Sequence, residues 1–478
     1  MQSDSSNYYI NKQSNKKITF IILLLLVISN SGILKAQGVQ YITSANGEYK
    51  FTAKQVKITN SSSKEDSAIA LIRFDANKRF QKMEGFGYAL TGGSAALIDQ
   101  LSAPKKNAIL QEVFGNSKAN LGVSYIRISM GASDLDANVF SYCDLPTEET
   151  DSLLKHFNLS EDTLHLIPIL KKALAIRPAL KIMASPWSPP IWMKSNGLSM
   201  GGHLLKKYYA SYANYFVMYI QAMKKQGIKI AAVTMQNEPE HGGNNPSLLM
   251  DALEQKEFLK NYLGPQFKKA NIKTEIVLFD HNADHPNYPI SIMNDSLAKS
   301  YAAASAFHLY LGDESALSKV HFAHPDKKIY FTEQWTGAKG EFGGDLMWHL
   351  EHIVLGTINN WSSVVLEWNL AANAKFEPHT LGGCTECKGA FTIQGDSVSR
   401  NASYYIIGQA SKYIPAGAQR VAATSSVTSI KTAGFILPNG KKVSLVLNTG
   451  AAKKVKLIVE NREMVFDLPS ASASTLVW

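Results

Sequence analysis

The sequence contains only three cysteines in 478 residues. So few cysteines exclude a scaffold that is held together by many disulfides. Cys384 and Cys387 form a CxxC motif, which can be half of a zinc site, but no second pair exists to complete one. The motif therefore predicts either a disulfide or two free thiols, and no metal site. Cys143 stands alone, and we expect it to be a small buried residue.

The sequence also lacks a long run of basic residues. The formal net charge is +10, and the lysines are scattered along the chain, often as pairs such as Lys105-Lys106. Proteins that bind nucleic acids instead concentrate Lys and Arg on one face or one helix. We therefore expect a mildly basic surface and no nucleic-acid partner.

No apolar run is long enough to cross a membrane as a helix, which takes about 20 residues. The run at the N-terminus, Ile18–Ile28, follows Lys16-Lys17 and precedes the small residue Ala36. A charged segment, a short apolar core and a small residue at the cut are typical of a secretory signal peptide. We predict that residues 1–36 are such a signal, that no transmembrane span remains once it is removed, and that the protein is secreted or periplasmic. An uncleaved anchor is the alternative.

The glycine-rich loop of dinucleotide-binding folds is missing, because Gly85-Phe86-Gly87 lacks a third glycine at the right spacing. Eight short apolar runs instead alternate with helical stretches such as Leu204–Lys225 and Glu254–Lys269. Parallel strands that are buried on both faces read in this way. We predict an α/β fold, a (β/α)₈ TIM barrel over residues 79–415, with a doubly wound sheet as the alternative. The predicted strands are Met83–Thr91, Val123–Gly131, Leu180–Trp187, Ile230–Asn237, Thr274–Asn282, Ser305–Tyr310, Lys328–Trp335 and Ser363–Asn369.

Both flanks of the predicted barrel are rich in β-forming residues. In the tail, residues 416–478, apolar residues alternate with polar ones, and Pro438-Asn439-Gly440 predicts a tight hairpin turn. Residues 37–78 read as further strands. We therefore predict a β-sandwich appended to the barrel, built from the tail and joined by the N-terminal segment.

Polar and aromatic residues stand at the ends of the predicted strands, where the active sites of this fold form. Glu238 and Glu333 each end a strand, and hydrolysis of a glycoside needs two carboxyl groups that flank the scissile bond. A carboxylate beside a helix N-terminus is the alternative for either glutamate alone. Asp280, His281 and Asn282 either line the site or stiffen its rim, and we favour the rim. The other candidate residues at strand ends are Arg127, Trp187, Asn237, His308, Tyr310, Trp335 and Trp368.

These motifs together resemble glycoside hydrolase family 30, which contains glucosylceramidases and microbial β-1,6-glucanases. The resemblance extends in the right order over about residues 80–478. It is carried by Gly85-Phe86-Gly87, Tyr125-Ile126-Arg127 with Asp134, Ala184-Ser185-Pro186-Trp187-Ser188-Pro189, Asn237-Glu238-Pro239, His308-Leu309-Tyr310, Thr332-Glu333, Glu367-Trp368-Asn369-Leu370 and Gln419-Arg420-Val421.

The resemblance implies a catalytic role for two glutamates. Glu238 matches the acid/base, and Asn237 matches a residue that holds the 2-hydroxyl of the sugar. Glu333 matches the nucleophile, and Arg127 matches the arginine that keeps it ionised. We therefore expect a lowered pKa at Glu333, a raised pKa at Glu238, and carboxyl groups about 5–5.5 Å apart if the enzyme retains configuration.

The resemblance also implies residues that surround the sugar. Trp187 and Trp368 match residues that contact the sugar, and His308 and Tyr310 match residues around the nucleophile. Trp335 either borders the sugar or packs at the mouth of the barrel. The mechanism requires no metal or organic cofactor.

The sequence departs from the family at Gly92, where relatives that act on glucose carry an aspartate. The loss of this carboxylate leaves the preferred sugar open. We expect a retaining β-glycosidase acting on a β-linked glycoside, oligosaccharide or glycolipid, first of all a β-glucosidase of the glucosylceramidase type. A β-1,6-glucanase, β-xylosidase or β-fucosidase is the alternative, and a non-catalytic carbohydrate-binding protein is a remote one.

Overall fold

The computed structural model describes residue 1, residues 37–61 and residues 69–478. The predicted signal peptide therefore lies almost entirely outside the described residues. Within the described part of the chain, no helix has both the length and the apolar composition to span a membrane.

Eight parallel strands close into a barrel, in which neighbours in sequence are also neighbours in the sheet and β12 pairs with β4. The predicted TIM-barrel fold is confirmed, and each predicted run contains or overlaps one strand. The strands are β4 (Gly85–Ala89), β5 (Tyr125–Ser129), β6 (Lys181–Ser185), β7 (Ala232–Thr234), β8 (Glu275–Asn282), β9 (Ala302–His308), β10 (Lys328–Glu333) and β12 (Ser362–Asn369).

Two strands differ most from their predicted bounds. β7 is much shorter than the predicted run Ile230–Asn237 because the chain leaves the sheet after Thr234 to place its next residues over the barrel mouth. β9 begins at Ala302, earlier than predicted, since its first residues are alanines that carry no strand signal of their own. Side chains that point inward from the strands fill the barrel, as is usual for this fold.

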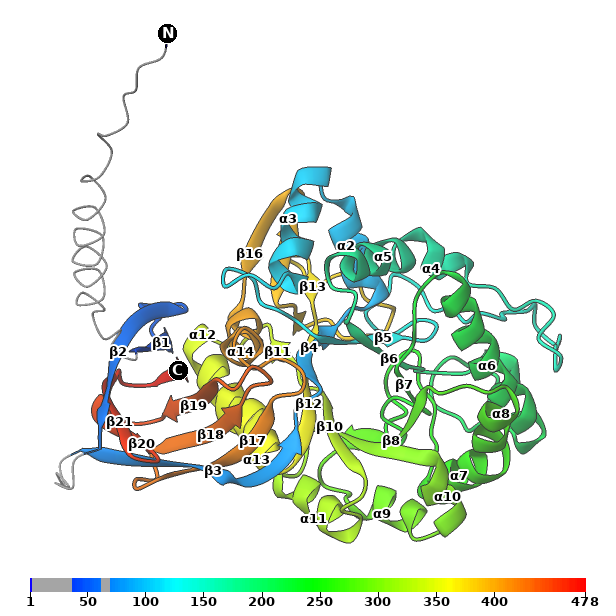
Figure 1. Ribbon diagram of the computed structural model, residues 1–478. Coiled ribbons are helices and arrows are strands. Elements are labelled where there is room, and N and C mark those ends of the chain that lie inside the picture. Colours follow the sequence, from blue (N-terminus) through cyan, green and yellow to red (C-terminus); the bar gives the residue numbers. More distant parts are fainter. Residues whose placement is uncertain (2–36, 62–68) are drawn as a thin grey trace.

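Helices cover the outside of the barrel (Figure 1). The helix predicted over Leu204–Lys225 begins later, at Tyr209, because residues 206–208 form a 3₁₀ turn. The stretch Glu254–Lys269 is interrupted by a π-helical turn over Leu259–Leu263. The helices are α2 (Gly92–Gln100), α3 (Ala103–Phe114), α4 (Ser160–Leu164), α5 (Leu166–Ile176), α6 (Tyr209–Lys225), α7 (Ala252–Phe258), α8 (Gly264–Lys269), α9 (Asn287–Met293), α10 (Ser296–Tyr301), α11 (Ser315–Ala323), α12 (Phe342–Trp348), η4 (His349–Gly356), α13 (Thr357–Asn359) and α14 (Ala402–Ser411).

The second domain is the predicted β-sandwich, and its sheet closes on itself where β1 pairs with β22. The N-terminal strands lie among the C-terminal ones, blue between red and orange in Figure 1, because β3 pairs with both β17 and β20. The predicted hairpin turn at Gly440 joins β18 to β19. The strands are β1 (Gln37–Ser44), β2 (Thr52–Asn60), β3 (Ala70–Lys82), β17 (Gln419–Ser425), β18 (Ile430–Ile436), β19 (Lys442–Asn448), β20 (Lys453–Val459), β21 (Arg462–Leu468) and β22 (Ser472–Val477).

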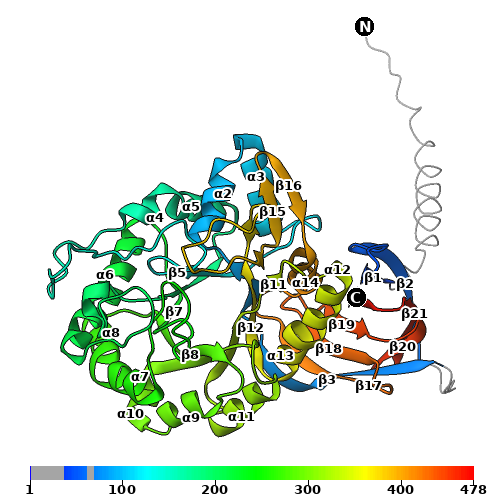
Figure 2. The ribbon, with the colours of Figure 1, turned by 180° about the vertical axis from the view of Figure 1, so that it is seen from behind.

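The two domains share a buried interface, and Figure 2 shows α12, α13 and α14 between them. Apolar side chains of β18 and β19, such as Phe435 and Leu445, belong to the same hydrophobic core as the barrel helices. Gln409 on α14 donates to the Tyr41 carbonyl at 2.8 Å and accepts from Thr43 at 2.9 Å. Because its amide is buried and bonded to β1, this contact fixes how the sandwich sits against the barrel.

Two small sheets are built from short strands in the loops that follow β10 and β12. Strands β11 and β14 pair with each other, and β13, β15 and β16 form a three-stranded sheet. Their bounds are β11 (Thr336–Gly337), β13 (Ala371–Ala372), β14 (Cys387–Lys388), β15 (Phe391–Gln394) and β16 (Ser397–Arg400).

Asp162 makes the stability of the barrel depend on pH. Its side chain is buried and accepts a hydrogen bond from Tyr142 at 2.7 Å, and burial raises its pKa to about 7, which Asp136 and Glu161 reinforce. The folded chain therefore keeps a proton that the unfolded chain has lost above about pH 4. The contribution of Asp162 to the free energy of unfolding is thus fully present below about pH 4 and is lost as pH rises towards 7.

We predict that Asp162→Asn reduces this loss, by up to about 1.4 kcal/mol per pH unit, because the asparagine cannot titrate. Urea unfolding at several pH values between 4 and 7 measures the slope. Glu149→Gln, which changes an exposed acid, is the matched control and should keep the wild-type slope. Equal slopes for Asp162→Asn and the wild type would contradict the prediction.

Candidate active site

Glu238 reaches the barrel mouth through a strained backbone conformation. It follows β7 and adopts a φ of 44°, a left-handed region that a glutamate rarely occupies. Its amide donates to the Asp280 carbonyl at 3.0 Å, which holds the strained turn in place. Its Oε2 accepts a hydrogen bond from Asn244 at 3.3 Å. The predicted acid/base thus projects into the site instead of along the strand.

Glu333 is the last residue of β10, and both of its carboxylate oxygens accept hydrogen bonds. Arg127 donates to Oε2 at 2.6 Å, and the Tyr310 hydroxyl donates to Oε1 at 2.9 Å. The predicted contact between Arg127 and Glu333 is therefore present, and Tyr310 lies beside Glu333 as expected. Donors on both oxygens fit an ionised carboxylate.

Arg127 lies fully buried beneath the site and connects four side chains. Besides Glu333, it donates to Asp280 at 2.8 Å, to Asn237 at 2.6 Å and to Ser185 at 3.0 Å. This set uses every nitrogen of the guanidinium. The fork of an arginine, unlike a lysine, can hold several acceptors in fixed directions at once. One side chain on β5 therefore positions groups from β6, β8 and β10 and from the loop after β7.

Two tryptophans cover Arg127 on the side of the cavity. The guanidinium lies 4.8 Å from the ring centre of Trp187 and 5.8 Å from that of Trp368. The two rings stack on each other at 5.5 Å. A cation over aromatic faces is attracted by their negative π clouds, the more so when both are desolvated. The pair thus forms a rigid apolar wall at the place predicted for sugar contacts.

Asp280 is the residue that sequence reasoning placed wrongly. We expected it to stiffen the rim, but its side chain is fully buried at the centre of the site. It accepts hydrogen bonds from Arg127 and from four other side chains, which are Ser185, Thr234, His308 and Thr332. Burial alone would raise the pKa of Asp280, but Arg127 and His308 outweigh it and hold the pKa well below its usual range. The only signal in the sequence was a carboxylate near the end of an apolar strand.

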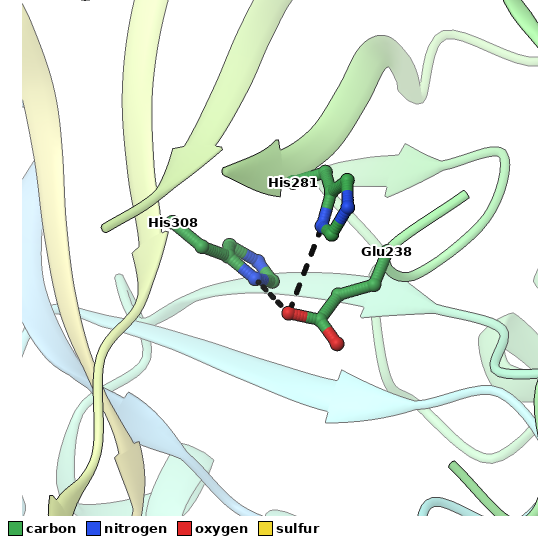
Figure 3. A group of neighbouring side chains, drawn as sticks. All are labelled: Glu238, His281 and His308. Carbon is green, nitrogen blue, oxygen red and sulfur yellow. Dashed lines mark hydrogen bonds and ion pairs between the residues drawn. The ribbon is translucent and has the colours of Figure 1, made fainter. Parts of the chain in front are cut away.

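His308 lies between the carboxylates and is fully buried. Its Nδ1 is 3.1 Å from Oε1 of Glu238 and 3.8 Å from Oε1 of Glu333, and its Nε2 is 3.2 Å from Asp280. Burial lowers the pKa of His308, but the surrounding carboxylates outweigh this and raise it to about 9. His308 is thus near Glu333, as expected, and it is closer still to Glu238, beside which Figure 3 shows it.

The pKa directions of the two glutamates differ from our expectation. Burial raises the pKa of Glu238, but the hydrogen bond from His308 and the charges of His281 and His308 outweigh it, so the net direction is down. Burial raises the pKa of Glu333, and the charges of Glu238 and Asp280 reinforce this against Arg127 and His308. The sequence could not reveal that two histidines flank Glu238, since they come from β8 and β9.

A cavity of about 470 Å³ opens above these groups. Six of the predicted residues line it, whereas Arg127, Asn237 and His308 lie beneath its floor. Trp335 is among the lining residues, at the mouth. The lining consists of Asp134, Trp187, Glu238, His241, Asn244, His281, Asn282, Tyr310, Leu311, Glu333, Trp335, Trp368, Cys384 and Cys387.

Cys384 and Cys387 form a disulfide, which settles the choice that the sequence left open. The disulfide borders the cavity, and the Cys384 amide donates to Asp134 at 3.3 Å. Asp134 itself is buried, and burial together with the charges of Glu333 and Glu238 raises its pKa to about 7. The lone Cys143 is buried, as predicted.

The carboxylate of Asp136 occupies the space beside Gly92, where the sequence lacks the aspartate of the family. A Cβ added to Gly92 would lie only 1.7 Å from Oδ1 of Asp136. Asp136 is buried and accepts hydrogen bonds from the amide and hydroxyl of Ser133 through its other oxygen, Oδ2. A neighbouring side chain thus takes the place of the missing aspartate side chain, but it lines an adjacent cavity and not the one above the glutamates.

Asp280 should contribute strongly to stability because it compensates two buried cations. We predict that Asp280→Asn lowers the free energy of unfolding by about 3–5 kcal/mol, the cost of breaking a buried pair. Denaturant unfolding monitored by tryptophan fluorescence measures the change. The exposed Asp284→Asn should remain within about 0.5 kcal/mol of the wild type. Similar losses in both variants would contradict the central position of Asp280.

Comparison with known proteins identifies the family of both domains. The glycosyl hydrolase family 30 TIM-barrel domain matches residues 83–414, and the family's beta sandwich domain matches residues 417–476. An endo-1,6-β-D-glucanase of Aspergillus fumigatus is 31% identical over 436 residues, covering 86% of this chain and 87% of that protein. The lysosomal acid glucosylceramidase of Mus musculus is 28% identical and covers 85% of this chain and 83% of its own length.

A solved structure of an endo-β1,6-glucanase is also similar. It superposes with a TM-score of 0.86 at 34% identity, over 92% of this chain and 99% of that one. The resemblance that the sequence motifs indicated is therefore confirmed over both domains. The chain belongs to glycoside hydrolase family 30 and is a glycosyl hydrolase that acts on a glycan.

Proposed function

We propose that this protein is a retaining β-glycosidase that cleaves β-1,6-linked glucan, with Glu333 as the nucleophile and Glu238 as the acid/base. The observation that carries the proposal is the pair of buried glutamates that face one cavity, with Arg127 bonded to Glu333 and His308 next to Glu238. Glu333 is bonded to Arg127 and Glu238 to His308, and such different surroundings let one carboxyl group act as nucleophile and the other as acid/base.

The spacing of the glutamates supports retention. Nδ1 of His308 is 3.1 Å from one glutamate oxygen and 3.8 Å from the other. Oε1 of Glu238 and Oε1 of Glu333 therefore lie at most 6.9 Å apart, the sum of these two distances. Inverting enzymes hold their carboxyl groups roughly 6.5–9.5 Å apart to admit a water, whereas retaining enzymes hold them about 5–5.5 Å apart. The contact with His308 leaves little room for the inverting arrangement.

The reaction then proceeds in two displacements. In the first, the Glu333 carboxylate attacks the anomeric carbon, the glycosidic C–O bond breaks, and Glu238 gives its proton to the departing oxygen. This step leaves an ester between Glu333 and the sugar. In the second, Glu238 takes a proton from water, the water oxygen bonds to the anomeric carbon, and the ester bond to Glu333 breaks. Both glutamates return to their starting states.

His308 supplies the proton in this scheme. The raised pKa of His308 and the lowered pKa of Glu238 describe one proton that lies on the imidazole in the resting site. The 3.1 Å contact between Nδ1 and Oε1 lets it pass to Glu238 as negative charge develops on the leaving oxygen. After the second displacement, the proton that Glu238 took from water passes back to the imidazole through the same contact. The ion pair with Asp280 keeps the ring oriented for this transfer.

The groups around the glutamates provide the sugar subsite. Arg127 donates to Oδ1 of the Asn237 side chain. The NH₂ group of the same side-chain amide is therefore left to donate to a sugar hydroxyl. The stacked rings of Trp187 and Trp368 give the sugar an apolar wall. Tyr310 holds Glu333 from the opposite side to Arg127. These contacts orient the carboxylate for attack.

A sugar leaving group is supported by the polar lining beside Glu238. Four residues with hydrogen-bonding side chains, His241, Asn244, His281 and Asn282, line the cavity next to the acid/base. Such groups pair with hydroxyls, whereas a lipid chain would leave them without partners. Relatives named as endo-1,6-β-glucanases are 31–32% identical to this chain, compared with 28% for the mouse glucosylceramidase. We therefore favour a β-1,6-glucan over the glucosylceramide that the sequence placed first.

Export also remains part of the proposal. The charged and apolar segments within residues 16–36 support secretion to the cell exterior or periplasm. A secreted or periplasmic enzyme would have access to a polymeric glucan outside the cytoplasm.

A substrate panel tests the proposed specificity. We predict that purified protein releases oligosaccharides of mixed length from a linear β-1,6-glucan, faster than it cleaves glucosylceramide or aryl β-glucoside, β-xyloside and β-fucoside. Chromatography of the early products measures this. Glucose alone as the first product would indicate exo action, and a preference for glucosylceramide would overturn the choice of glucan.

Two variants test the roles of the glutamates. Glu238→Ala should lower kcat on the glucan by about 10²–10⁴-fold. On an aryl β-glycoside, whose leaving group departs without a proton, it should recover with azide and form a β-glycosyl azide, because azide attacks the glycosyl-enzyme without needing a base. Glu333→Ala should lose turnover and recover only as an α-glycosyl azide. NMR identifies the anomer. Glu240→Gln, which changes an exposed acid two residues from Glu238, is the control with wild-type activity. The same anomer from both variants would contradict the assignment.

A further inference from the structure

We propose that Glu238, His281 and His308 form an inhibitory binding site for a divalent transition metal such as Zn²⁺. The site goes beyond the proposed reaction, which needs no metal. Only the inhibition rests on the role proposed for Glu238; metal binding itself does not. Among the described residues, this is the one group of three or more His, Cys, Asp or Glu side chains whose ligand atoms converge, all within 4.8 Å of one another.

The spacing of the three ligand atoms suits a tetrahedral metal. Oε1 of Glu238 lies 3.1 Å from Nδ1 of His308 and 3.7 Å from Nδ1 of His281 (Figure 3). Two ligands on a tetrahedral zinc, each about 2.0–2.2 Å from the metal, are roughly 3.3–3.5 Å apart. These two distances lie on either side of this value, and the two imidazole nitrogens lie within 4.8 Å of each other. Movements of the side chains by about 1 Å or less would therefore let one metal reach all three ligand atoms.

His281 is the member of the group whose ligand nitrogen, Nδ1, makes no hydrogen bond to another described residue. Its side chain is more than nine-tenths buried, and its Nδ1 is a buried atom without a hydrogen-bond partner among the described residues. A buried nitrogen that makes no hydrogen bond costs free energy. It faces Glu238, so a metal held between the two would satisfy it.

His308 already has the support that metal-binding histidines require. Its second nitrogen, Nε2, lies 3.2 Å from Asp280, and Asp280 in turn accepts from Thr332 at 2.7 Å. A ligand histidine usually donates its other N–H to a carboxylate, which orients the ring and makes the free nitrogen a better ligand. The same partner that orients His308 for proton transfer therefore prepares it for a metal.

The kind of metal follows from the ligands. Two imidazoles and one carboxylate favour Zn²⁺ or Cu²⁺ over Ca²⁺ or Mg²⁺, which prefer oxygen ligands alone. Glu238 and His281 border the cavity, so the fourth position would face solvent. A metal on Oε1 of Glu238 occupies the atom that must carry the proton, and turnover stops while it is bound.

Calorimetric titration of the full-length wild-type protein with ZnSO₄ tests the proposal without any substrate. We expect one Zn²⁺ per chain, and visible bands of tetrahedral Co²⁺ when cobalt replaces zinc. His281→Ala should weaken binding by at least about tenfold, since even an outer partner of a metal ligand contributes that much. His241→Ala, which removes a histidine of the same cavity outside the group, should bind Zn²⁺ like the wild type.

Glu238→Gln serves as a second ligand variant if His281→Ala fails to fold, and circular dichroism reports on folding. Hydrolysis by the wild type should fall in step with zinc occupancy and return with EDTA. Absence of zinc binding by the wild type, or equal binding by the wild type and a folded ligand variant, would overturn the site. A chain that binds zinc but cleaves no glycan would refute the proposed function alone, so the two failures are distinguishable.

Discussion

Arg127 carries a positive charge with no exposure to water, and the site is arranged around the need to compensate it. A buried guanidinium is tolerated only when acceptors surround it. Here Asp280 and Glu333 supply the opposite charge, and Asn237 and Ser185 accept the remaining N–H groups. The same bonds that satisfy the arginine therefore orient the glutamate that faces the cavity.

Asp280 extends this constraint across the barrel mouth. It joins Arg127 to His308, and His308 contacts Glu238, so the two glutamates are connected through a chain of buried charges. Burying any one of these charges without a partner would cost free energy of folding. Together they are stable, because the low dielectric of the interior strengthens the attraction within each pair. The parallel strands make the network possible, since all of their C-terminal ends meet at one face.

The sequence was sufficient for the fold and for most of the residues at the site. Periodic apolar runs predicted eight strands, and the alternation in β19 and β20 predicted the sandwich, because burial on one or two faces leaves a pattern in the chain. Glu238 and Glu333 stood out because charged residues rarely end apolar strands without a reason. Asp280 stands near the end of an apolar strand in the same way. No feature of the neighbouring sequence distinguishes a carboxylate that turns inward from one on the rim.

The sequence by itself therefore determined the barrel, its appended sandwich and the identity of the chemical groups at the strand ends. Only the tertiary structure decided which of them meet: that two histidines flank Glu238, that Asp280 lies beneath both glutamates, and that Asp136 fills the space beside Gly92. These contacts join residues from different strands, and their pKa values depend on distances across the barrel. Such distances are set by packing around the closed sheet, which no local pattern in the chain records.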